Sequence, residues 1–149
     1  PGTAFSPLLV LTEAQADLAS LRLTLEGDGL RVAVVLDLDE HGVLHADAAL
    51  TNVGEGSYRL EALNIALPAP DRAAEALDFT GRWGKEKQEQ RRPIQQGEWI
   101  HPGRHGRTGH DGAGLLVVGT SGFGFGHGEA WGVHLAWSGD QEQRVERIG

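Results

Sequence analysis

Apolar and polar residues alternate strictly near the start of the chain. In residues 20–26, Leu21, Leu23 and Leu25 occupy every second position with polar residues between them, and residues 30–38 repeat the pattern. This period of two is typical of β-strands with one buried face. Gly27-Asp28-Gly29 separates the two runs, as in a tight hairpin. The pattern therefore predicts two antiparallel strands with one dry face and one wetter face.

The alternation continues over residues 43–53 and 58–67, with turn residues at 39–42 and 54–57. Residues 20–67 are thus expected to form a four-stranded antiparallel meander. Pro68-Ala69-Pro70 ends the pattern, and Asp71 could cap a short helical turn over residues 72–76 before an extended stretch at 77–80.

The second half of the chain gives weaker signals. Residues 81–113 are polar and irregular, with one possible strand at 94–100, and further strands are expected at 115–118, 129–137 and 143–148. The Gly-rich run 122–128 is expected to be a hairpin with Phe123 and Phe125 packed inward. The sequence predicts an all-β, antiparallel β-sandwich: residues 1–19 an N-terminal extension or linker, residues 20–149 the sandwich domain.

Composition narrows the class of protein. With 149 residues the chain is one domain or a piece of one, and without Met it is expected to derive from something longer. The formal net charge of −8 argues against a nucleic-acid binder, and no apolar run is long enough to span a membrane. The absence of Cys excludes disulfides and thiolate chemistry and fits a reducing compartment, so we expect a cytoplasmic protein.

Positive charge is concentrated in residues 82–107, which hold seven Lys and Arg against three Glu. These cations either pair with the protein's own carboxylates in a solvated loop or form a surface that meets an acidic neighbour or polar ligand. Trp83 lies between Arg82 and Glu86 in this region. Trp and Arg are favoured at binding surfaces, although a Trp that anchors a loop to the core is the more ordinary interpretation.

No complete active site is evident. His101, His105 and His110-Asp111 contain zinc-ligating residue types, but Pro102 and Gly103 interrupt any helix that would hold them, so we expect neither a metal site nor a cofactor. The run 122–128 lacks a phosphate-loop pattern, and no Gly-x-Ser-x-Gly elbow is present. Nothing indicates two carboxylates that converge, as glycoside hydrolysis requires. We therefore assign no catalytic residue.

Several motifs of the second half resemble glycoside hydrolase family 36, the bacterial α-galactosidases, in the correct order. They are Leu67-Pro68-Ala69-Pro70, Asp78-Phe79-Thr80-Gly81-Arg82-Trp83, Gln88-x-Gln90-Arg91, residues 104–110 and residues 128–139, with Thr51-Asn52-Val53-Gly54 preceding them. The resemblance covers roughly residues 43–147 and falls in the family's N-terminal β-supersandwich, of which this chain would be a part. The family usually has Asn where Asp140 stands.

The resemblance implies a parent enzyme that hydrolyses terminal α-galactosides with retention, using two aspartates on a (β/α)8 barrel that this chain lacks. It implies a structural role for this piece: docking the barrel, shaping the pocket rim and assembling a homo-oligomer. The expected contact residues are Arg82, Trp83, Glu86, Arg107 and His110. The alternative is a stand-alone carbohydrate-binding β-sandwich with Trp83 or Trp99 as a stacking platform.

Overall fold

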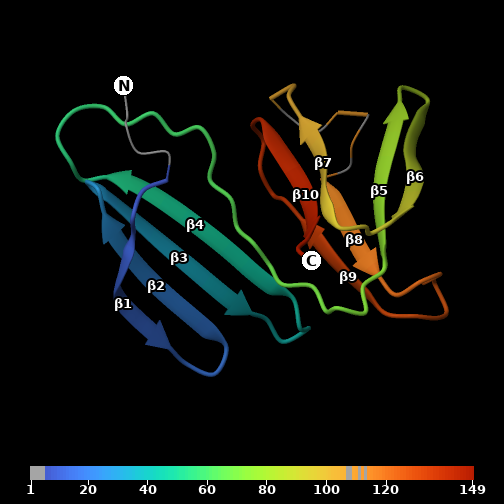
Figure 1. Cartoon of the computed structure of the whole chain (residues 1–149), viewed down its shortest axis with the longest axis horizontal. Helices are drawn as coiled ribbons and strands as arrows, with labels where there is room; N and C mark the ends of the chain where they lie inside the picture. Colours follow the sequence, from blue (N-terminus) through green and yellow to red (C-terminus); the bar gives the residue numbers. More distant parts are fainter. Residues whose placement is uncertain (1–5, 107–108, 111, 113) are drawn as a thin grey trace. The chain divides into compact units, whose positions relative to one another are not determined.

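The computed structural model describes residues 6–106, 109, 110, 112 and 114–149 (Figure 1). Its strands pair antiparallel throughout these residues, which confirms the all-β prediction. A helix long enough and apolar enough to cross a bilayer is not found in this part of the chain. The chain divides into two compact units, Pro1–Leu67 and Pro68–Gly149.

Unit 1 is a four-stranded meander in the order β1-β2-β3-β4. Its strands are β1 (Val10–Ala16), β2 (Ser20–Gly27), β3 (Leu30–Leu38) and β4 (Leu44–Asn52). Asp28 and Gly29 form the two-residue turn between β2 and β3 with φ values of 51° and 73°, the left-handed geometry that matches the twist of a hairpin. Leu23 pairs with Val34 and Leu25 with Val32 across the two strands, so the alternating apolar residues share one face, on which Val32 is buried and Leu23, Leu25 and Val34 are half-buried.

Two segments of unit 1 differ from the sequence pattern. β1 lies within the segment expected to be an extension or linker, and it pairs along β2 with an irregularity between Leu11 and Glu13. The strand predicted at 58–67 is wrong, because these residues form no strand and pair with no neighbour. Leu60 and Ile65 there are 49% and 44% exposed. Alternation alone does not make a strand when no partner accepts its backbone hydrogen bonds.

Unit 2 contains two sheets, with orders β6-β5-β8-β9 and β10-β7. The strands are β5 (Glu75–Arg82), β6 (Lys85–Pro93), β7 (Gly97–Gly103), β8 (Leu115–Gly119), β9 (Ala130–His134) and β10 (Gln141–Arg147). Side chains of β7 contact side chains of β5 and β6, so the two sheets face each other. The buried apolar residues between and beside them are Ala73, Ala76, Leu77, Leu116 and Phe123.

The expected helical turn at 72–76 is wrong: a turn at 71–72 leads directly into β5. The irregular interpretation of 81–113 is wrong where β6 lies, whereas the possible strand at 94–100 is confirmed as β7 with shifted ends. β6 is polar on both faces and is the outermost strand of its sheet, so it carries no alternation to detect. Strands at 115–118, 129–137 and 143–148 are confirmed with shifted ends, the middle one shortened to β9.

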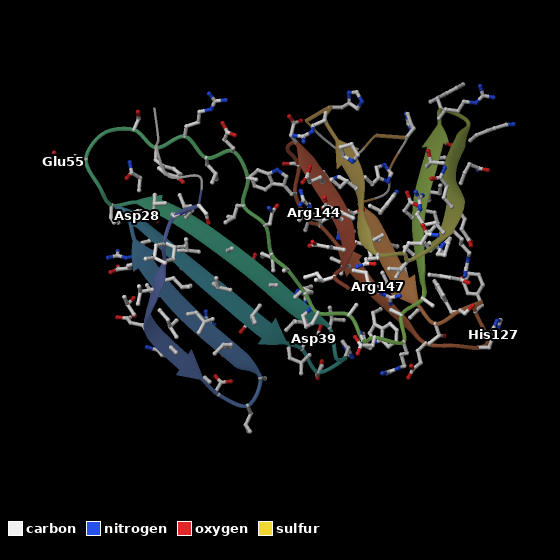
Figure 2. The ribbon with its side chains drawn as sticks, in the orientation of Figure 1. Asp28, Asp39, Glu55, His127, Arg144 and Arg147 are labelled. Atoms are coloured by element: carbon white, nitrogen blue, oxygen red, sulfur yellow. The ribbon has the colours of Figure 1, made fainter. Side chains whose placement is uncertain are left out.

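Arg147 of β10, labelled in Figure 2, ties the second sheet to the entry of the first. Its Nη2 donates to the carbonyl of Ala73 at 2.5 Å and its Nη1 to the carbonyl of Ile94 at 3.4 Å. Both carbonyls flank strands, where the backbone would otherwise lack partners. The small sheet is thereby fixed against the large one.

Candidate functional site

The β5–β6 hairpin presents Trp83 at its tip. Arg82 pairs with Lys85, so Trp83 and Gly84 form a two-residue turn, in which Gly84 has a φ of 75°. The Trp83 side chain is 83% exposed. It therefore does not anchor the loop to the core of unit 2.

The base of the hairpin is tightly constrained. A Cβ atom on Gly81 would lie 2.6 Å from the Lys85 carbonyl oxygen and 2.7 Å from that of His110, so only glycine fits there. Opposite Gly81, the register shifts between Thr80 and Arg82, which marks a β-bulge. Lys87 lies in this bulge with a φ of 53°, which is unusual for a residue with a side chain. The bulge twists the strands and sets the direction in which the tip projects.

Glu86 stabilises the turn from below. Its Oε1 accepts the N–H of Gly84 at 2.8 Å and lies 3.6 Å from Nδ1 of His110. The Gly84 N–H is the main cause that holds the pKa of Glu86 below its ordinary value, and its own backbone N–H and the charge of His110 act in the same direction. Glu86 is therefore ionised at neutral pH, which strengthens the hydrogen bond that it accepts from the turn.

The structure thus brings four of the five sequence-predicted residues to one end of unit 2: Arg82, Trp83, Glu86 and His110. Arg107, the fifth, lies outside the described residues. Asp140 accepts the backbone N–H of Gly106 at 3.0 Å in the adjoining loop. An Asn side chain has the same acceptor oxygen, so the departure from the family pattern preserves this contact.

The basic segment separates into two groups. Arg91, Arg92 and Arg104 pair with carboxylates of unit 2: Arg91 with Glu89, Arg92 with Asp78 at 2.6 Å, and Arg104 with Glu142 at 3.3 Å. Arg82, Lys85 and Lys87 are exposed and pair with no carboxylate among the described residues. Among the described residues of this basic segment, the cations without a carboxylate partner therefore all lie on the hairpin that carries Trp83.

A buried network that the sequence analysis missed lies beneath this surface. Asp78 is 2% exposed, and its two oxygens contact Arg92 Nη2 at 2.6 Å and His101 Nδ1 at 2.9 Å. The Arg92 guanidinium lies 4.1 Å from the centre of the Trp99 ring, and the His101 ring meets Trp99 edge-on at 5.9 Å. Since both carboxylate oxygens are engaged, Asp78 holds the facing sheets together and does not present itself to a substrate.

His101 thus has a structural partner in place of the metal considered from the sequence. Within the described residues, no three His, Asp or Glu side chains gather in a way that could hold a metal ion. The only feature of the sequence that points to this network is Asp78, a charged residue among the apolar residues near the start of β5.

The other end of unit 2 carries the loop between β8 and β9, opposite the β5–β6 hairpin (Figure 1). Phe123 is buried as expected, and Arg91 lies over its ring at 4.3 Å. The inward placement of Phe125 is wrong, because its side chain is fully exposed. Gly124 and His127 exchange backbone hydrogen bonds, and this closure turns Phe125 outward.

These features define an all-β antiparallel domain with an exposed hairpin that carries an aromatic residue and basic residues. The chain belongs to the glycosyl hydrolase family 36 N-terminal domain family, whose model matches residues 7–148. The match extends the resemblance toward the N-terminus and includes β1.

Comparison with individual relatives supports the same family. An α-galactosidase of Escherichia coli is 37% identical over 147 residues, which make up 97% of this chain and 21% of that protein. The structure of the α-galactosidase AgaB from Geobacillus stearothermophilus superposes with a TM-score of 0.81 at 20% identity, over 96% of this chain and 23% of that one. The galactosidase domain of the α-galactosidase–sucrose kinase AgaSK gives 0.82 at 19% identity, over 95% and 23%. The chain therefore spans less than a quarter of these relatives.

Proposed function

We propose that the chain is the non-catalytic N-terminal part of a cytoplasmic α-galactosidase that hydrolyses terminal α-galactosides with retention. Family membership and the 37% identity to an α-galactosidase support this function. Because the chain spans 21% of that relative, the catalytic barrel is expected elsewhere in the parent. The role of this domain is to dock the barrel, shape the rim of its pocket and assemble the homo-oligomer.

The exposed hairpin tip is the observation that carries the contact role. Leaving a Trp 83% exposed forgoes the burial of a large apolar surface, roughly 1.5–3 kcal/mol for such a side chain. The tip is nevertheless held in place by Gly81, the bulge and Glu86, so little conformational entropy remains to be lost on contact. A rigid Trp beside unpaired cations matches the residues that dominate protein interfaces.

The contact residues of this proposal are Arg82, Trp83, Glu86, Arg107 and His110. Glu86 and His110 act by fixing the hairpin, whereas Arg82 and Trp83 meet the neighbouring surface. That surface is acidic where it faces Arg82, and it belongs either to the barrel or to another subunit of the same enzyme.

The test is the double variant Arg82→Ala with Trp83→Ala in the full parent enzyme. We expect a raised KM for melibiose or a weakened oligomer in light scattering. In the isolated chain, where both side chains are exposed, the double variant should leave the unfolding midpoint unchanged. Phe125→Ala is the matched control, since it removes an equally exposed ring from the opposite end of the unit. A double variant with parental KM and parental oligomeric state would exclude the contact role.

A further inference from the structure

A pocket of about 340 Å³ lies between the two sheets of unit 2 where β6 passes into β7. Ala76 of β5 and Val145 of β10 contribute apolar walls, and Trp99 and Arg92 line the same space. The connecting residues Gln95 and Gln96 complete the lining with two amides. Its size is at the lower end of the range for small-molecule sites, about 300–1,000 Å³, which suits a ligand no larger than a disaccharide.

The charged groups around the pocket are already neutralised. Arg92 donates to Asp78 at 2.6 Å, and the Glu98 carboxylate, which also lines the pocket, lies 2.7 Å from Arg144 Nη1. A phosphate or carboxylate ligand would have to compete with these carboxylates, and an amine with the arginines. The pocket therefore favours a neutral ligand.

Hydrogen-bonding groups in the lining are left without protein partners. Gln95 and Gln96 are exposed, and their side-chain amides have no hydrogen-bond partner among the described residues. The amides supply both donors and acceptors, as a hydroxyl-bearing ligand requires.

We infer that this pocket is a non-catalytic binding site for a neutral mono- or disaccharide. Trp99 carries the Arg92 guanidinium on one face, and the part of its indole that lines the pocket provides apolar surface for the C–H groups of a sugar ring. The side-chain amides of Gln95 and Gln96 hydrogen-bond the sugar hydroxyls. The site is separate from the Trp83 hairpin, and only the choice of an α-galactoside as first probe rests on the proposed function.

The experiment is a titration of the isotope-labelled 149-residue chain with melibiose, maltose and inorganic phosphate, followed through the four tryptophan indole N–H resonances. Replacing each Trp by Phe assigns the resonances. We expect the Trp99 signal to shift and saturate with a Kd of about 1–10 mM for at least one disaccharide, while phosphate leaves it unchanged. Tighter binding of melibiose would agree with an α-galactosidase parent. Tighter binding of maltose would support the site but argue against an α-galactoside as its ligand.

Variants of the pocket residues test whether the sugar binds in this pocket. Gln95→Ala with Gln96→Ala removes two hydrogen-bonding side chains and is expected to weaken binding about tenfold. The control Gln15→Ala with Gln88→Ala removes two exposed amides on β1 and β6 and is expected to leave the Kd unchanged. The inference is overturned if Trp99 is silent up to about 100 mM sugar, if only Trp83 responds, if phosphate shifts Trp99 equally, or if the Gln95/Gln96 variant binds normally.

Discussion

Replacing Asp78 tests whether the buried network holds the sheets of unit 2 together. Asp78→Ala removes an acceptor that is 2% exposed and leaves the Arg92 guanidinium and the His101 ring without it. Breaking a fully buried ion pair costs about 3–5 kcal/mol, and one charge-assisted hydrogen bond contributes about 1.5–3 kcal/mol. The Arg92 and His101 side chains are 30% and 24% exposed, so water replaces part of the lost interaction. We expect a loss of about 2–3 kcal/mol, and about half that for Asp78→Asn, which keeps one acceptor oxygen.

Urea unfolding followed by tryptophan fluorescence measures this loss of stability in unit 2. All four Trp lie after residue 68, so their fluorescence reports unit 2 alone. Glu146→Ala, which removes an exposed carboxylate on β10 of the same unit, is the control and should cost less than about 0.5 kcal/mol. Asp78→Leu with Arg92→Met should be more stable than Asp78→Leu alone, because the second change removes the unpaired cation. The reasoning fails if Asp78→Ala costs under about 0.5 kcal/mol, or if adding Arg92→Met brings no recovery.

Three further outcomes follow from individual contacts. Lys87→Gly should stabilise unit 2 by up to about 1 kcal/mol, because glycine adopts the left-handed backbone without strain. The control Lys85→Gly should destabilise it. A lower free energy of unfolding for Lys87→Gly in urea would refute strain in the bulge. Phe123→Ala should cost about 3–5 kcal/mol by the same assay and Phe125→Ala almost nothing, since one ring is buried and the other exposed; equal costs would contradict the loop structure. The hydrogen bond from Arg72 lowers the pKa of Glu129, so this carboxylate stabilises the fold above its ordinary value of 4.5 and loses that effect as pH falls through the lowered pKa. In a plot of the urea unfolding midpoint against pH, Glu129→Gln should therefore reduce the fall of the midpoint at acid pH. An unchanged fall would show that the Arg72–Glu129 pair contributes nothing to stability.

Sequence patterning predicted the strands that have one buried and one exposed face. β2, β3 and β4 fall in this class, because cross-strand pairs such as Leu23 with Val34 place every second residue on the same face. Residues 58–67 show the limit of the rule, since alternation describes what a strand needs but does not supply its partner. β1 was missed because all its residues are exposed, which leaves no contrast between faces.

The location of the contact residues could be predicted from the sequence, but the buried network could not. Arg82, Trp83 and Glu86 are neighbours in the chain, so their common location follows from a single turn. Asp78 is joined to Arg92 across 14 residues and to His101 across 23, and no local pattern encodes either pairing. Only the register of β5 with β6 and the packing of β7 against both create that network.

The charges that concealed β6 from pattern analysis also explain how this edge of the sheet stays unpaired. An outermost strand exposes backbone donors and acceptors that another strand can pair with, and charged side chains discourage that pairing. Between Lys85 and Pro93 the strand carries Lys, Glu, Gln and Arg on both faces, and almost all of it is exposed. Backbone pairing along β6 would bring these charges against those of a second copy. Under the proposed function, we therefore expect an interface at this end of unit 2 to form through the tip, where the exposed Trp83 and the cations of the hairpin would favour an acidic surface.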